Sequence, residues 1–169
     1  MVECESIAKV GVQHFESLFQ EDKNLHLPEV VKSAGFFPTS ISEVENVELM
    51  KDVTMQELKS ILDISKNDKR PGPDGIPVEV YRSLFDVLGE DLLRVVEDSQ
   101  QFGKIPVVFN STFIALIPKV DHPNTFEYFR PISLCNFIYR VIGKLISIRI
   151  GKVLGHYISG EQFGFLPGR

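Results

Sequence analysis

The sequence predicts an α+β fold that is largely helical and contains one antiparallel β-hairpin. Apolar residues recur at helical spacing through much of the first hundred residues, and a capping motif precedes one of these stretches. Two short apolar runs, 113–117 and 129–134, are separated by turn residues. With 43% hydrophobic and 24% charged residues, the composition is that of a globular protein.

Apolar spacing and capping signals place the first helices. The spacing predicts a helix over 5–20, whereas 21–50 shows no clear period and is predicted to be an extended connection. Thr54 and Glu57 are three residues apart and stand directly before an apolar stretch. They predict a capping box and a helix over 55–65.

A rigid turn and two more helices are predicted next. The two prolines and two glycines of 70–75 favour a fixed turn. Pro77 is suited to the start of a helix and Gly89 to its C-cap, and a further helix is predicted to end at Gly103. The side chains expected to face inward on these two helices are Val80, Tyr81, Leu84, Phe85, Leu88, Leu92, Leu93, Val96 and Phe102.

The apolar runs 113–117 and 129–134 are predicted to pair as a hairpin, with the turn residues 121–124 between them. Asn136 is a suitable N-cap for a helix over 137–154. The inward arc of that helix is predicted to hold Phe137, Ile138, Val141, Ile142, Leu145, Ile146 and Ile148.

Three cations on the last predicted helix differ in their expected roles. Arg149 falls on the same arc as Ile142 and Val153, and a buried guanidinium needs an acidic partner or a set of carbonyls. We therefore interpret Arg149 as structural. Arg140 and Lys144 lie on the polar face, where they either contact a phosphate backbone or are only solvated.

Positive charge is concentrated in the second part of the chain. Residues 1–103 hold 10 Lys and Arg against 20 Asp and Glu, a net charge of −10, whereas 104–169 hold 8 against 3, a net of +5. Phosphate binding requires a basic surface, which we expect in residues 104–169. The alternative is a solvated face that is basic by chance.

Four motifs follow one another from residue 70 onward. They are Arg-Pro-Gly-Pro-Asp-Gly at 70–75, Thr-Phe-Ile-Ala-Leu-Ile-Pro-Lys-Val at 112–120, Phe-Arg-Pro-Ile-Ser-Leu-Cys-Asn at 129–136 and Gln-Phe-Gly-Phe-Leu-Pro-Gly-Arg at 162–169. Their order and their residues resemble the reverse transcriptase of LINE-type (non-LTR) retrotransposons, most closely the plant elements. The resemblance covers about residues 5–169 and is most specific after residue 70.

The resemblance implies a fragment of an RNA-directed DNA polymerase. Residues 1–50 would be a spacer upstream of the polymerase, and 51–169 would form the fingers of the polymerase right hand, with palm and thumb missing. The family's aspartates, which hold Mg²⁺, lie further along its chain. After residue 103 the only acids here are Asp121, Glu127 and Glu161. We therefore expect the isolated chain to hold no catalytic residue, metal or other cofactor and to be inactive as an enzyme.

The resemblance also implies binding roles. Lys119 and Arg130 match the fingers residues that contact the incoming nucleotide, and a paired hairpin would bring both cations near its tip. The alternative is that hairpin ends are charged because they face water. Lys69 and Arg70 flank the 70–75 turn, where they contact the template backbone or merely follow a helix C-terminus.

The remaining motif residues are assigned in the same way. Gln162 and Arg169 match the family's pattern near the template strand. Asp74 is interpreted as a turn residue rather than a metal ligand, because a Pro-Asp-Gly turn uses the Asp side chain for its own backbone bonds. Cys4 and Cys135 form no CxxC pattern and predict free thiols.

The implied partners are an RNA template, a DNA primer and the missing palm and thumb segment. We expect no association with a membrane. No apolar run approaches the roughly 20 residues that span a bilayer, and the N-terminus is acidic, unlike a signal peptide. We expect an intracellular protein, and the nucleus is one candidate location. Two alternatives to an enzyme fragment are a non-catalytic nucleic-acid-binding module and an inert helical interaction protein.

Overall fold

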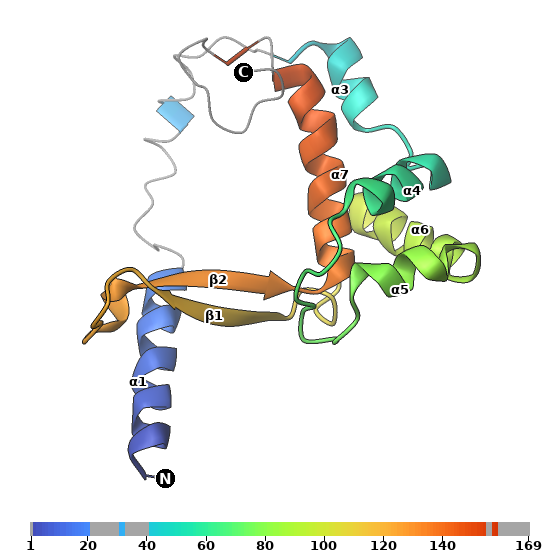
Figure 1. Cartoon of the computed structure of the whole chain (residues 1–169). Coiled ribbons are helices and arrows are strands. Elements are labelled where there is room, and N and C mark those ends of the chain that lie inside the picture. Colours follow the sequence, from blue (N-terminus) through green and yellow to red (C-terminus); the bar gives the residue numbers. More distant parts are fainter. Residues whose placement is uncertain (1, 21–30, 33–40, 155–156, 159–169) are drawn as a thin grey trace. The chain divides into compact units, whose positions relative to one another are not determined.

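A computed structural model describes residues 2–20, 31–32, 41–154 and 157–158 (Figure 1). Across them the fold is α+β and mostly helical, which confirms the predicted class. The two strands, β1 (Thr112–Pro118) and β2 (Phe129–Cys135), pair as the predicted hairpin. The chain forms two compact units, residues 1–39 with 116–132 and residues 40–115 with 133–169. The boundary that the resemblance places at residue 50 stays a prediction.

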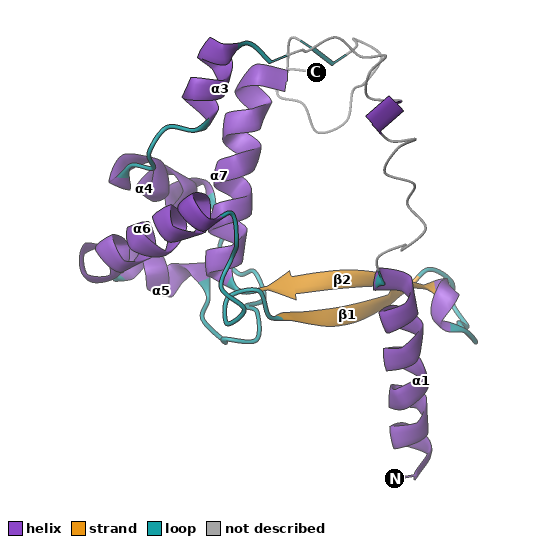
Figure 2. Ribbon diagram, turned by 180° about the vertical axis from the view of Figure 1, so that it is seen from behind, coloured by secondary structure: helices purple, strands orange, loops and turns teal. Residues whose placement is uncertain are grey.

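The smaller unit joins α1 (Val2–Phe19) to the tip of the hairpin (Figures 1 and 2). The tip carries a short 3₁₀ helix, Phe126–Tyr128. The ring of Phe126 lies against Gly11, where an added Cβ would come within 3.0 Å of it. Phe15 is buried beside the same ring, with centroids 6.1 Å apart. Gly11 thus lets the helix approach the tip closely.

The larger unit is a group of helices around one apolar core. Its main elements are α4 (Met55–Ile64), α5 (Val78–Ser83), α6 (Phe85–Phe102) and α7 (Phe137–Leu154), which Figure 2 shows packed together. The capping box of Thr54 begins α4 as predicted. The buried core consists of Val53, Leu58, Ile61, Leu62, Val78, Tyr81, Leu92, Val96, Phe137, Ile138, Val141, Ile142 and Leu145.

A short helix, α3 (Glu43–Leu49), lies in the stretch predicted to be extended, so that prediction is wrong there. It begins with a second capping box, in which the Glu45 amide donates to Ser42 Oγ at 3.3 Å and the Ser42 amide donates to Glu45 Oε2 at 2.9 Å. Seven residues are too few to show a helical period, which is why the spacing alone missed it. The rest of 21–40, apart from residues 31–32, lies outside the described residues.

The prediction that Gly89 ends a helix is also wrong. The break falls at Leu84, and α6 continues through Gly89 to Phe102. Gly89 is buried, and a Cβ there would lie 2.7 Å from the end of the flexible Met55 side chain, so this glycine lies within a packed part of the helix and not at its end. Three side chains predicted to face inward, those of Val80, Leu84 and Phe102, are exposed instead. Gly103 ends α6 as predicted, in the left-handed conformation with φ of 62°.

An apolar groove of about 500 Å³ lies between α3, α6 and α7. Ile146, predicted to face the core, is half exposed and lines this groove. The helix therefore has one more accessible apolar side chain than its spacing predicts.

The interpretation of Arg149 as a structural residue is confirmed. Its side chain is buried, and its Nε and Nη2 donate to the Glu57 carboxylate at 3.3 and 3.0 Å. The other bonds go to the carbonyls of Leu49, Lys51 and Asp52. One guanidinium thus fixes α7 to the cap of α4 and to the chain that leaves α3.

Replacing Arg149 by alanine is expected to lower the free energy of unfolding by about 3–5 kcal/mol, because the Glu57 carboxylate and three carbonyls lose their partner. Urea denaturation followed by circular dichroism measures the change. Arg94→Ala is the matched control, since Arg94 is an exposed arginine on α6 whose pairs with Glu90 and Asp91 contribute about 0.5 kcal/mol or less. Equal effects of the two substitutions would contradict the structural role.

The stability of this unit is expected to depend on acid pH through Glu57. Burial alone would raise the pKa of this carboxyl, but the bonds from Arg149 and from the Thr54 amide hold it below its ordinary value of 4.5. A lowered pKa stabilises the fold above pH 4.5, and this contribution disappears as the pH falls through the folded-state value. Glu57→Gln should therefore be less stable than the wild type at neutral pH, with the difference in unfolding free energy narrowing on acidification. Urea titrations at several pH values test this, and a difference independent of pH would refute it.

Candidate nucleic-acid interface

The loop that follows α4 is held in place by Arg82 of α5. Nη2 of Arg82 donates to the carbonyls of Leu62 and Ser65 at 2.6 and 2.8 Å, and Nη1 donates to the side chain of Asn67. Asp68 then takes the left-handed conformation, with φ of 57°, and turns the chain toward the 70–75 motif. Arg82 therefore holds the backbone of the loop that carries Lys66 and Lys69.

The 70–75 turn is attached to the start of α7 through Asn136, which is buried. The Asp74 amide donates to Asn136 Oδ1 at 3.0 Å, and Asn136 Nδ2 donates to the Val108 carbonyl at 3.2 Å. At Gly72 an added Cβ would lie 2.4 Å from the Asn136 amide nitrogen. These contacts bring three segments of the chain to one junction.

Two sequence-based assignments can be compared with this junction. Asn136 is the N-cap residue of α7 as predicted, since the helix begins at Phe137 and the Asn136 carbonyl accepts the Arg140 amide at 3.2 Å, but its side chain binds the Asp74 amide and the Val108 carbonyl. Asp74 accepts a bond from the Ile76 amide at 3.1 Å, which confirms the interpretation of Asp74 as a turn residue.

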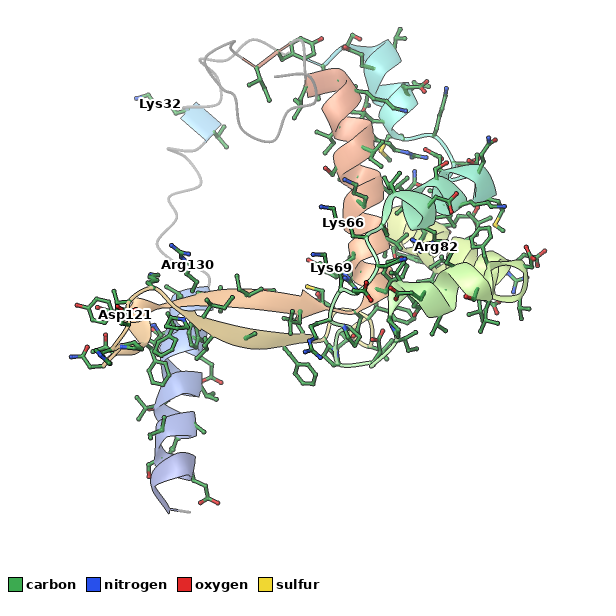
Figure 3. The ribbon with its side chains drawn as sticks, in the orientation of Figure 1. Lys32, Lys66, Lys69, Arg82, Asp121 and Arg130 are labelled. Atoms are coloured by element: carbon green, nitrogen blue, oxygen red, sulfur yellow. The ribbon has the colours of Figure 1, made fainter. Side chains whose placement is uncertain are left out.

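Four cations line one hollow of about 270 Å³ between this loop and the first turns of α7. Lys66 and Lys69 come from the loop and lie beside α7 in Figure 3, while Arg140 and Lys144 come from the helix. None of the described residues that line the hollow is acidic; the others are Ile64, Ser65, Val78 and Phe137. The hollow is therefore a concentrated positive site whose uncharged lining is mostly apolar.

Arg140 is held differently from Arg82 and Arg149. Its guanidinium lies over the Phe137 ring, with 5.3 Å from Cζ to the ring centroid. Its Nε and Nη2 are buried without a hydrogen-bond partner among the described residues. Glu79 is a nearby acid: the backbone amides of Glu79 itself and of Asp68 hold the pKa of its carboxyl below the usual value, and the charges of Arg82 and Arg140 contribute less.

The hairpin carries the two cations predicted to contact a nucleotide. Lys119 directly follows β1; its amide donates to the Tyr128 carbonyl at 2.7 Å, and its ammonium donates to the Glu127 carbonyl at 2.8 Å. Arg130 is exposed at the tip end of β2 and is labelled in Figure 3. The predicted pairing does bring both cations near one tip.

The predicted binding residues thus divide into groups. Lys69, Arg140 and Lys144 share the hollow, whereas Arg70 is exposed and does not line it. Lys119 and Arg130 belong to the smaller unit, and Gln162 and Arg169 lie outside the described residues.

Lys66 is the member of the hollow that sequence reasoning missed. The signal was the short basic run that Lys66 forms with Lys69 and Arg70. It lies in the first part of the chain, whose net charge is −10, so two of the four cations, Lys66 and Lys69, come from outside the basic segment 104–169. A net charge averages over all faces and hides a local cluster.

No group of three or more His, Cys, Asp or Glu side chains suited to a metal ion occurs among the described residues. The described residues therefore do not provide the cluster of carboxylates that a pair of Mg²⁺ ions requires, and we assign no catalytic step to them. Cys135 is a free thiol that accepts a bond from Thr112 Oγ1 at 3.0 Å. Within the described part of the chain, no helix is long and apolar enough to cross a membrane.

Comparison with known proteins identifies relatives of the chain. No protein-family model matches the chain. The Transposon TX1 uncharacterized 149 kDa protein of Xenopus laevis is 31% identical over 129 residues, which are 76% of this chain. The Pol polyproteins of the type-1 retrotransposable elements R2 and R1 of Bradysia coprophila are 26% and 24% identical, over 70% and 79% of this chain.

The chain is related to LINE-type, non-LTR retrotransposon proteins. It spans only 10%, 13% and 14% of the length of these three relatives. The activity of a complete retrotransposon polyprotein is therefore a separate question, and the resemblance to plant elements stays a prediction.

In this retrotransposon-derived chain, Gly72→Ala is expected to lower the free energy of unfolding by about 2–3 kcal/mol, because the new methyl group would overlap the backbone of Asn136 and Cys135. Gly75→Ala is the matched control. A Cβ at Gly75 meets open space, and the cost is the positive φ alone, about 1 kcal/mol. Chemical denaturation of both variants measures the difference; a Gly72→Ala protein as stable as Gly75→Ala would contradict the junction.

Proposed function

We propose that this chain is a fingers segment of the RNA-directed DNA polymerase of a LINE-type retrotransposon, and that it contacts the phosphate backbone of the template. The observation that carries the proposal is the hollow formed by Lys66, Lys69, Arg140 and Lys144, which gathers four cations without a lining acid. Relatedness to retrotransposon Pol polyproteins supports a nucleic acid as the partner.

Phosphate is the ligand chemistry that fits this cluster best. Lysines bind phosphate oxygens as point charges, and an arginine can bind two oxygens at once. No ion pair to Lys66, Lys69 or Lys144 is found among the described side chains, so their charges are available to a ligand. Apolar side chains in the lining, such as Phe137, lower the local dielectric constant, which strengthens the attraction between the cations and an anion.

The hairpin has a second role in this proposal. Lys119 and Arg130 would contact the triphosphate of the incoming nucleotide, as the family resemblance implies. Carboxylates elsewhere in a complete polymerase would hold Mg²⁺ and perform nucleotidyl transfer with the primer, so that this stretch positions nucleic acid and nucleotide without catalysing the reaction.

A different function, docking of a protein partner, is favoured by one observation only, the apolar groove between α3, α6 and α7. This docking function predicts that the cations of the hollow are solvated and do not contribute to binding of a nucleic acid.

Binding of single-stranded RNA is expected to be weak, independent of sequence and strongly dependent on salt. The logarithm of the binding constant falls linearly with the logarithm of the salt concentration, and each phosphate contact contributes about −0.7 to that slope. Four cations therefore give a slope of roughly −3. Lys69→Ala and Lys144→Ala should each weaken binding and flatten the slope by about 0.7. Fluorescence anisotropy with labelled RNA across a salt series is the measurement.

The matched control is Lys59→Ala, an exposed lysine on α4 that does not line the hollow. The double variant Lys119→Ala/Arg130→Ala reports the contribution of the hairpin. If Lys69→Ala and Lys144→Ala bind RNA no differently from Lys59→Ala, the hollow is not the contact, and the docking function becomes the better account.

A further inference from the structure

The geometry points to a discrete phosphate-binding pocket in this hollow, in which the guanidinium of Arg140 recognises a single phosphate group and three lysines hold it by charge. The inference deepens the proposed function, because it names the group that is bound and the residue that selects it. It predicts saturable binding of a small phosphate ion, which a diffuse basic surface does not.

A comparison of three arginines carries the inference. Arg149 satisfies its guanidinium with one carboxylate and three carbonyls, and Arg82 uses two carbonyls and an amide oxygen. Nε of Arg82 has no partner, but both its terminal nitrogens do. Arg140 is the one of the three with two buried, unpartnered nitrogens, its Nε and Nη2.

Nε and Nη2 form one edge of the planar guanidinium, and this is an edge that binds two oxygens of a carboxylate or phosphate side by side. Leaving buried donors without an acceptor costs about 1–3 kcal/mol. An anion that supplies two oxygens at this edge removes that cost. Both nitrogens are buried, and Arg140 lines the hollow, so we expect the guanidinium to turn from the Phe137 ring toward the hollow when the anion binds.

The surroundings select phosphate over a carboxylate. Lys66, Lys69 and Lys144 add three positive charges around the same hollow, which suit a group with several charged oxygens. Glu79, the acid that interacts with Arg140 through space, accepts a 2.8 Å bond from the Asp68 amide and does not line the hollow.

The test is titration of inorganic phosphate into the full chain at constant ionic strength, followed by ³¹P NMR line broadening. We expect saturable binding by the wild type and binding about tenfold weaker in Arg140→Gln. Arg140→Lys keeps the charge but loses the planar fork, and it should also bind more weakly than the wild type. Arg94→Gln, on the exposed face of α6, is the matched control and should bind as the wild type does.

Arg140 is half-buried, so its substitution can also disturb the fold. The loss of phosphate binding in the Arg140 variants is therefore compared with the loss in Lys144→Gln, a substitution at an exposed position. Weaker phosphate binding by Lys144→Gln, with an unchanged circular dichroism spectrum, supports the pocket. Equal binding by wild type, Arg140→Gln and Lys144→Gln overturns it.

Two RNA oligonucleotides, one with a 5′-phosphate and one with a 5′-hydroxyl, distinguish the sources of the phosphate. A terminal phosphate as the occupant predicts tighter binding of the 5′-phosphate oligonucleotide by the wild type but not by Arg140→Gln. An internal phosphate predicts that Arg140→Gln weakens both equally.

The pocket and the proposed function fail in different ways. Phosphate binding without RNA binding would keep the pocket and remove the nucleic-acid role. RNA binding that depends on Lys69 and Lys144, without saturable phosphate binding, would keep the role and remove the pocket.

Discussion

The buried guanidinium of Arg149 is the interaction on which the helical unit depends. Its five hydrogen bonds join the last long helix to the cap of α4 and to the chain leaving α3. A buried arginine is tolerable only when such partners are present. Since Glu57 also closes the capping box with Thr54, one carboxylate serves both local helix initiation and long-range packing, and a substitution of Glu57 alters both.

A second constraint, near the other end of α7, determines where positive charge gathers. The approach of Gly72 to Asn136, too close for any side chain, fixes the 70–75 turn against the start of the helix. The loop before the turn then lies beside the helix turns that carry Arg140 and Lys144. The glycine of the motif is therefore needed for position, and the cations around the hollow provide the chemistry.

Local signals predicted much of the fold because their physics is local. The capping box at Thr54, the left-handed glycine at 103 and the alternation of apolar and turn residues each act within a few residues. The same kind of signal at Ser42 was available but stood before a helix too short to show a period. Gly89 was misread because a glycine at a helix end and a glycine under a packed side chain look alike in a sequence; only the position of Met55 separates them.

By itself the sequence determined the mostly helical α+β class, the hairpin, the structural role of Arg149 and the relationship to LINE-type retrotransposon proteins. These follow from periods, caps, one charge on an apolar face and the order of motifs. Tertiary structure alone decided that Lys66 joins Lys69, Arg140 and Lys144 around one hollow, because these residues come from segments more than sixty positions apart. A charge cluster formed across such a distance depends on how helices pack, and neither net charge nor spacing along the chain encodes it.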